Sequence, residues 1–221
     1  MSKQTFSIES VVYLDGAQDK AAEARSRYKE FYPGRSARRM THLGMMIGAC
    51  IQKLGAEKSV PVLYASAFGE SESLERFIDS FPQASPALFQ SSIHPSAVEQ
   101  ALIPSKQAVD RFYPITSERF LFAKALENCF LLEEEEVVLL GGEERGDWLV
   151  PVELASGESF AFGLRLRRGG DGLGTISLES DVSLEGAVDT PFSELARALE
   201  ERRQIRVPSF ALDAWIRIDW K

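Results

Sequence analysis

Histidine and cysteine are both scarce in this sequence of 221 residues, which contains two of each. The two thiols, Cys50 and Cys129, are far apart and form no Cys-x-x-Cys pair. A structural zinc site takes its ligands at characteristic spacings, so the sequence does not indicate one. The glycine-rich stretch "RGGDGLG" lacks the lysine and the serine or threonine of a phosphate-binding loop. We therefore expect neither a bound metal nor a cofactor.

Long apolar runs and an excess of positive charge are missing as well. We find no run of about 18 apolar residues and no signal-peptide pattern, so we expect no membrane span and a cytoplasmic location. The formal net charge of −8 disfavours nonspecific binding to nucleic acid or to an anionic membrane. Apolar residues make up 44% of the sequence, which is sufficient for a sizeable core. No linker divides the sequence, so residues 1–221 are expected to form a single domain.

Apolar spacing in the first two thirds predicts strands and helices that alternate along the chain. Strands are expected at residues 6–16, 60–69, 110–117 and 137–140. Helices are expected at residues 40–54, 71–81, 94–103 and 117–132. Gly55 follows the first of these helices, where a C-cap glycine is common. Such alternation is typical of an α/β layered fold with a largely parallel sheet.

The last third of the sequence favours antiparallel strands. Residues 159–167 and 174–180 flank the glycine-rich stretch, which predicts a hairpin. Thr190 is expected to cap a helix whose first residue is Pro191. From Phe210 to Trp220 the apolar residues alternate strictly, which predicts a half-buried strand.

The stretch "SPALFQSSIHPSAVEQ", residues 85–100, contains one of the two histidines. We expect a proline-marked loop followed by a helix that starts near His94. Either Pro95 occupies the first helical turn, or Ser96 and Glu99 form a capping box, and the pattern leaves both arrangements open. A histidine at such a place is more often a structural hydrogen-bonding or capping residue than a catalytic base.

Five stretches occur in an order that resembles the N-terminal half of the β-ketoacyl synthases. They are "RRMTHLGMMIGAC", "VPVLYASAFGE", "SPALFQSSIHPSAVEQ", "YPITSERFLFAKALENCFLL" and "VVLLGGEE". The resemblance covers roughly residues 38–144 and is weaker toward either end. The most similar group is the short ketosynthase-like proteins of aryl polyene and related type II polyketide pathways, which look like a chain-length factor reduced to its N-terminal half. This resemblance implies a thiolase-like half with a mixed five-stranded sheet between helices, followed by C-terminal antiparallel strands.

The sequence departs from a working condensing enzyme, which needs a thiolate to accept the acyl chain and groups that stabilise the reacting carbanion. In the family, this cysteine sits at the turn between a strand and a helix, and two catalytic histidines come from the C-terminal half. The corresponding turn, residues 114–119, contains no cysteine, and Cys129 lies about three helical turns beyond Ser117. The resemblance therefore implies a non-catalytic subunit that pairs with a full-length ketosynthase and meets an acyl carrier protein through that complex.

The resemblance also implies which residues face the partner, because in the family the strand before the turn pairs across the dimer and the histidine-bearing segment lies alongside. The expected interface residues are Phe89, Ser92, His94, Arg111, Phe112, Tyr113, Thr116, Ser117 and Phe120. Three aromatic side chains are expected to limit an acyl tunnel, namely Phe112, Phe120 and Phe122. The residues expected to dock an acidic acyl carrier protein are Arg35, Arg38 and Arg39.

Two other functions fit the sequence less well. A small serine-type acyl hydrolase or transferase would use Ser117, but the G-x-S-x-G pattern is missing and a turn or cap serine ahead of Glu118 is more usual. A free-standing module for binding acyl carrier protein would use the arginines, although a solvated charged surface is the more common outcome. The "EEEE" run at residues 133–136 is interpreted as a solvated connection between a helix and a strand.

Overall fold

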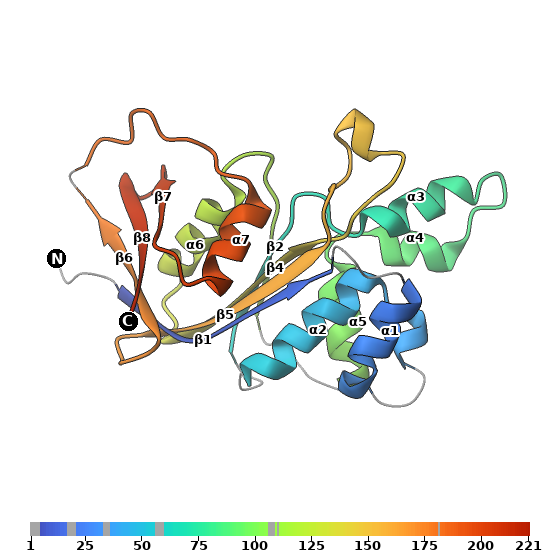
Figure 1. The fold of residues 1–221 in the computed structure, drawn as a ribbon, viewed down its shortest axis with the longest axis horizontal. Helices are drawn as coiled ribbons and strands as arrows, with labels where there is room; N and C mark the ends of the chain where they lie inside the picture. The colour runs from blue at the N-terminus through green and yellow to red at the C-terminus, as the bar shows by residue number, and fades with distance from the viewer. Residues whose placement is uncertain are drawn as a thin grey trace.

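The computed structural model describes residues 5–16, 21–32, 36–55, 60–105, 109, 111–180 and 182–221. Within them the chain forms one mixed sheet of eight strands in the order β3-β2-β4-β5-β1-β6-β8-β7, with helices on both faces (Figure 1). The strands are β1 (Thr5–Asp15), β2 (Val62–Ala65), β3 (Phe112–Ile115), β4 (Glu136–Glu143), β5 (Phe160–Arg168), β6 (Gly174–Glu179), β7 (Ile205–Ser209) and β8 (Ala214–Trp220). The predicted α/β class with a mixed sheet is confirmed, but the sheet is larger than the five strands expected.

The direction of the strands differs from the expectation. Only the β3-β2-β4 part of the described sheet is parallel, and every other neighbouring pair is antiparallel. The predicted hairpin of β5 and β6 is also wrong, because β1 lies between them: Ser7 is opposite Arg167 on one side and Thr175 on the other. A glycine-rich turn between two apolar runs does not specify whether a distant strand enters between them.

One face of the sheet is covered by α1 (Ala21–Tyr28), α2 (His42–Leu54) and α5 (Ser96–Ser105), shown below the sheet in Figure 1. Two short 3-10 helices, η1 (Lys29–Phe31) and η2 (Ser36–Arg39), precede α2. The hydroxyl of Thr41 accepts a 2.9 Å hydrogen bond from Gly44 N at the start of α2. Gly55 ends α2 with φ of 61°, a conformation that costs glycine little. The predicted helix and its C-cap are confirmed.

The other face is covered by α6 (Leu121–Leu131) and α7 (Phe192–Glu200), and the sheet curves so that β7 and β8 lie against α6 (Figure 1). Leu139 of β4 and Ile218 of β8 belong to one buried cluster with Leu126 of α6. The chain therefore covers both faces of its own central strands. Helix α7 begins one residue later than predicted, with Pro191 as its N-cap in place of Thr190.

Helices α3 (Ser71–Asp79) and α4 (Pro86–Ser92) form a pair that projects from one end of the molecule, at the right of Figure 1. The segment of α4 is predicted as a loop, but Ser85 caps a short helix by accepting a hydrogen bond from Leu88 N, with a proline in its first turn. A helix of this length has too few apolar positions to show a period in the sequence.

Helix α5 begins at Ser96, so neither predicted arrangement of its start is observed. Pro95 lies just before the helix, and Ser96 is a helical residue instead of the cap that a capping box requires. The Ser96 hydroxyl donates to Ser91 O at 2.9 Å and to Glu70 Oε1 at 3.0 Å. Glu70, which is far away in sequence, therefore replaces the local cap that the pattern suggests.

Buried glutamate side chains fix the starts of three helices. Glu144 accepts hydrogen bonds from His42 N and Leu43 N in α2 and from Ser73 N in α3. Glu70 accepts one from Ala97 N in α5. A carboxylate at a helix N-terminus pairs with free N–H groups and with the positive end of the helix dipole. Burial raises the pKa of Glu144 to about 8 and that of Glu70 to about 7.

Two more buried glutamates fix loops around α3. Glu143 accepts hydrogen bonds from Ala67 N, Phe68 N and Gly69 N, the loop after β2, and burial raises the pKa of this carboxyl to about 7. Glu75 of α3 accepts hydrogen bonds at 2.8 Å from Asp147 N and from Leu149 N. These bonds hold the loop that contains η3 (Val150–Val152) against α3.

The C-terminal strand is predicted correctly only from Ala214 onward. Ile216 and Ile218 are buried, as the alternation requires, and Trp220 is half-buried. Phe210 is 54% exposed and lies with Leu212 in the turn that joins β7 to β8, so the prediction is wrong for these two residues. The alternation of apolar residues continues through this turn, so the sequence pattern does not show where the strand begins.

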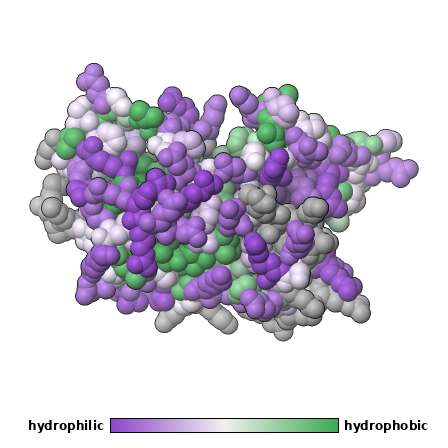
Figure 2. Space-filling view, viewed as in Figure 1, coloured by the Kyte–Doolittle hydropathy of each residue, from purple (hydrophilic) through white to green (hydrophobic). Residues whose placement is uncertain are grey.

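Figure 2 shows that the face viewed in Figure 1 is largely hydrophilic, with an apolar area where β1 crosses it. An open groove of about 340 Å³ lies there, lined by Val11, Val12, Tyr13, Lys53, Glu200 and Arg202. Across the part of the chain that the structure describes, no helix has the length and apolar character needed to span a membrane. The same residues hold no group of three or more histidine, cysteine or acidic side chains arranged for a metal ion.

Candidate partner interface

Among the described residues, strand β3 is the terminal strand of the sheet and one of its edges is unpaired. Its neighbour β2 runs parallel to it, with Val62 opposite Phe112 and Tyr64 opposite Pro114. The carbonyl group of Arg111 accepts a hydrogen bond from Val62 N of β2, and that of Ile115 accepts one from Ser66 N just after β2. Exposed edge strands are templates for pairing with another chain, so this edge is the first candidate for a partner contact.

The side chains of β3 join both cores of the molecule. Phe112 packs against the cluster around α2 and α5, whereas Tyr113 and Ile115 pack against the cluster around α6. Pro114 is exposed, and Arg111 forms an ion pair with Glu134 just before β4. The strand is therefore held rigidly from both faces while its outer edge is left open.

The turn after β3, which we call the elbow, ends in a sharp backbone conformation at Phe120, where helix α6 begins. This residue has φ of 56° and ψ of 32°, the left-handed region, and is the N-cap of α6. Non-glycine residues rarely adopt that conformation, which is typical of the strained strand-to-helix turn that exposes a nucleophile. The residue in this position is a phenylalanine, whose ring has no nucleophilic atom. The sequence predicts the turn at residues 114–119, and the strained residue lies one position further.

Contacts from outside the turn support Phe120. Its N–H donates a 2.8 Å hydrogen bond to Asp189 Oδ1, in the segment before α7. Its ring lies edge-to-face on Phe210 with centroids 5.1 Å apart, and the Arg119 guanidinium lies 5.1 Å from its centroid. Arg119 Nε also lies 3.7 Å from Asp189 Oδ2. The aromatic elbow is thus assembled by three separate parts of the chain.

Ser117, the candidate nucleophile of an acyl hydrolase, lies close to Lys124. The Lys124 ammonium donates a 2.6 Å hydrogen bond to Ser117 Oγ, and the hydroxyl itself donates to Arg119 O at 2.8 Å. A lysine acting as general base must be neutral and must accept the serine proton. Here the proton is directed to a carbonyl and Lys124 is exposed, so the arrangement is that of a turn-stabilising serine. Thr116, next to it, is exposed.

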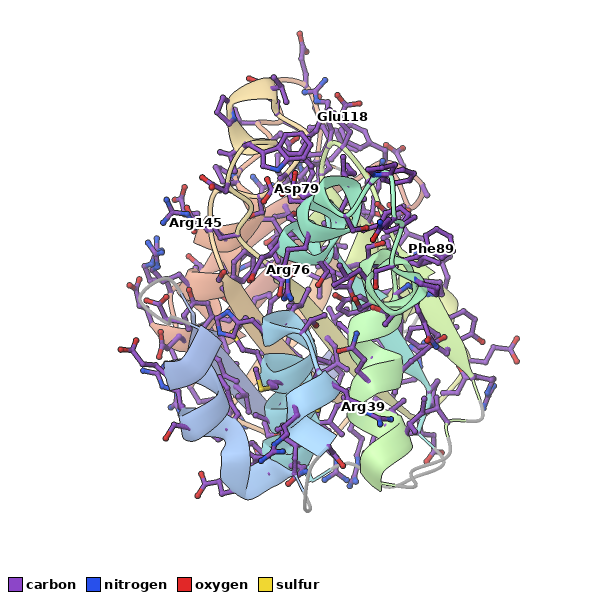
Figure 3. The ribbon with its side chains drawn as sticks, turned by 90° about the vertical axis from the view of Figure 1, so that its right-hand side faces the viewer. Arg39, Arg76, Asp79, Phe89, Glu118 and Arg145 are labelled. Atoms are coloured by element: carbon purple, nitrogen blue, oxygen red, sulfur yellow. The ribbon has the colours of Figure 1, made fainter. Side chains whose placement is uncertain are left out.

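An aromatic ridge is formed by Phe77 of α3, Phe89 of α4 and Phe81 in the connection between the two helices. Phe77 contacts the ring of Phe81 at 5.4 Å and the ring of Phe89 at 5.2 Å. Phe81 is 59% exposed and Phe89 is 50% exposed, and Ile78 and Ile93 are also exposed. In Figure 3, the labelled Phe89 and the light-green strand β3 lie toward the same side of the view. Clustered exposed apolar side chains of this kind mark protein-binding surfaces.

The predicted interface residues Ser92 and His94 have different surroundings. Ser92 is half-buried, and its hydroxyl donates to Phe89 O at 2.8 Å. The His94 ring stacks on the buried ring of Tyr64, with centroids 5.1 Å apart and an angle of 22°. Neither ring nitrogen of His94 has a hydrogen-bond partner among the described residues, and burial lowers its pKa. His94 is therefore a stacking residue, and the expectation of a hydrogen-bonding cap is wrong.

The structure does not bring the three predicted tunnel residues together around one cavity. Phe122 is 1% exposed and packs in the core against Phe162 at 5.8 Å. Phe112 and Phe120 are half-buried on β3 and at the elbow. A cavity of about 370 Å³ at the ends of β2 and β4 is instead lined by Ala67, Phe68, Glu143, Ala155, Ser156, Gly157, Glu158, Phe160, Phe192 and Ser193. For Phe122 the tunnel prediction fails within the isolated chain, because its ring is enclosed by core residues.

Of the predicted docking arginines, Arg38 and Arg39 are exposed on η2, whereas Arg35 lies outside the described residues. Figure 3 shows Arg39 and Arg76 on the same side of the molecule as Phe89. The acidic Asp79 of α3 is labelled on this side as well, so the view shows charges of both signs around the aromatic ridge.

Comparison with known proteins finds similarity only in the fold. No protein-family model and no curated protein matches the sequence. The structure is similar to a chain in the complex of a ketosynthase with its chain length factor from Xenorhabdus doucetiae, with a TM-score of 0.68 and 18% identity over 97% of this chain and 99% of that chain. It is also similar to the ishigamide ketosynthase/chain length factor, with a TM-score of 0.55 and 10% identity over 81% of this chain and 64% of that one. The predicted resemblance in fold to chains of ketosynthase and chain length factor complexes is confirmed.

Proposed function

We propose that this chain is a single-domain, cytoplasmic, chain-length-factor-like subunit that pairs with a full-length ketosynthase in aryl polyene or related fatty acid and polyketide biosynthesis. The observation that carries the proposal is Phe120 at the elbow, in a fold similar to that of ketosynthase complexes. The elbow keeps the strained backbone that presents a nucleophile in an enzyme, but it presents an aromatic ring. We therefore propose a non-catalytic role in which the partner supplies the thiolate and the catalytic histidines.

The unpaired edge of β3 and the aromatic ridge support pairing as the mode of action. Pairing at β3 would extend the sheet into the partner, while Phe81 and Phe89 would bury apolar area. At the same contact, Phe112 and Phe120 would lie where an acyl tunnel reaches the interface. Arg111, Tyr113, Thr116 and Ser117 complete the proposed interface around the edge strand.

The exposed arginines support a secondary contact with an acyl carrier protein. Arg38 and Arg39 are exposed in a chain whose net charge is −8, so they present local positive potential to an acidic carrier. We propose that this contact forms only after the ketosynthase has bound. Reversing both charges to glutamate should weaken carrier binding by the complex and leave the ketosynthase contact unchanged. Carrier binding by this chain alone would instead favour a free-standing carrier-binding module.

Co-expression with a full-length ketosynthase tests the proposal. The two proteins should co-purify, and Phe89→Glu should reduce the recovery of the complex at least tenfold, since it places a charge in a buried apolar contact. Val182→Glu is a matched control, because Val182 is 44% exposed but follows β6 in the other half of the sheet. The proposal fails if the ketosynthase is soluble and active and makes products of the same length without this chain.

A further inference from the structure

The outer edge of β3 has fewer hydrogen-bond donors than an ordinary edge strand. In a parallel pair, alternate residues direct their N–H and C=O groups to the neighbouring strand. Arg111 and Ile115 face β2 through their carbonyl groups, and the register places Tyr113 in the same set. Phe112 and Pro114 consequently direct their backbone groups away from the sheet.

Pro114 occupies one of these outward positions and has no N–H to offer. The open edge of β3 therefore presents the N–H and C=O of Phe112 but only the C=O of Pro114. Among the described residues, no backbone hydrogen bond uses these outward groups. A strand that adds to this edge can donate a hydrogen bond to the Pro114 carbonyl, but its own carbonyl opposite Pro114 receives no hydrogen bond, because proline has no N–H.

The missing donor has unequal consequences for two kinds of partner. Two copies of this chain that pair edge to edge about a twofold axis contribute the same patch, so each copy brings its own Pro114. In every register that places Pro114 opposite a residue of the other copy, the symmetric pair then lacks two backbone hydrogen bonds. A different chain without proline at the facing position lacks only one, because its own outward N–H groups are intact.

We infer that Pro114 makes the β3 edge selective for a different chain over a second copy of this one. The favoured partner is a strand with a non-proline residue opposite Pro114, whose N–H donates to the Pro114 carbonyl. The identity of that partner as a ketosynthase rests on the proposed function, but the weak pairing between copies does not. Proline on an edge strand hinders unwanted pairing with other strands. Here it hinders pairing between two copies more than pairing with a different chain, because a symmetric pair contains two such prolines.

Self-association of the purified chain, measured by analytical ultracentrifugation, tests the inference. Any residue other than proline restores the N–H, so Pro114→Ala and Pro114→Val should both favour a closed dimer. Each restored hydrogen bond should lower the dissociation constant about fivefold. The dissociation constant of the dimer, which gains two bonds, should therefore fall about 25-fold, and that of the ketosynthase complex, which gains one, only about fivefold. Thr116→Ala is the control, since it changes an exposed side chain beside the strand without changing any N–H. Circular dichroism should confirm that each variant is folded.

Three results would overturn the inference. The first is a wild-type chain that already forms a tight β3-mediated homodimer. The second is unchanged self-association in both Pro114 variants, and the third is open-ended aggregation in place of a dimer. A wild-type chain that binds no ketosynthase would refute the proposed function alone, because the self-association of the Pro114 variants is measured without the ketosynthase.

Discussion

Phe120 and Asp189 are joined by a 2.8 Å hydrogen bond from the backbone N–H of the first to a carboxylate oxygen of the second. This bond ties the turn after β3 to the segment before α7, which lies 69 residues further along the chain. It holds the elbow in the left-handed conformation that would otherwise be costly for a phenylalanine. The shape of the proposed interface therefore depends on a residue outside it.

Asp189→Ala should lower the free energy of unfolding by about 1–2 kcal/mol, because it leaves the Phe120 N–H without its acceptor. Asp189→Asn keeps an acceptor oxygen and should cost clearly less. Urea denaturation of both variants measures the difference. Equal losses in the two variants would show that the charge of Asp189, through its contact with Arg119, matters more than the hydrogen bond to the elbow.

Glu144 should make stability depend on pH. Its pKa is raised to about 8 by burial, so between about pH 4.5 and 8 the folded chain holds a proton that the unfolded chain has released. The free energy of unfolding should then fall as pH rises through this window. Glu70 and Glu143, with pKa values raised to about 7, add to the same trend.

Glu144→Gln cannot titrate and should flatten this pH dependence, whereas Glu144→Ala should destabilise the chain by about 3 kcal/mol because it frees N–H groups in both α2 and α3. Chemical denaturation at several pH values separates the two effects. A slope that is unchanged in Glu144→Gln would contradict the assignment of the raised pKa to this carboxyl.

His94→Phe should retain the stability of the parent, while His94→Ala should lose about 1 kcal/mol, because the role of His94 is to stack on Tyr64. Thermal unfolding of the two variants provides the comparison. A large loss in His94→Phe would mean that a ring nitrogen makes a contact in solution and would restore the hydrogen-bonding interpretation.

Ser117→Ala should leave thioester hydrolysis unchanged, at the background level of the parent chain. The hydroxyl donates to a carbonyl and receives a hydrogen bond from Lys124, so it is not activated as a nucleophile. Release of acyl groups from acyl thioesters is the assay. Activity in the parent that disappears in Ser117→Ala would favour the serine-type acyl hydrolase instead.

The sequence predicts those parts of the fold that local patterns determine. Helix α2 follows from helical spacing and Gly55, and β2, β3 and β4 follow from short apolar runs between turn residues. The insertion of β1 between β5 and β6 could not be predicted, because periodicity contains no information about which strands pair. The curvature that brings β8 over α6 is a tertiary feature of the same kind.

At the candidate site, the sequence identifies the segments but not the roles of single residues. The elbow is predicted to within one residue, yet the left-handed conformation of Phe120 depends on Asp189 and Phe210 from elsewhere in the chain. Glu143 and Glu144 are missed as buried residues because charged side chains are usually exposed, and their backbone partners come from loops and helices distant in sequence. The adjacent glycines, which allow close packing at the end of β4, were the only local signal.

Hydrogen–deuterium exchange of this chain, with and without the ketosynthase, tests the central claim most directly. The outward amide of Phe112 is free in the isolated chain and should become protected in the complex, together with peptides that cover α4. Peptides that cover β7, at the opposite edge of the sheet, should exchange as before. Protection that appears at β7, or at neither edge while the two proteins remain bound, would contradict pairing through β3.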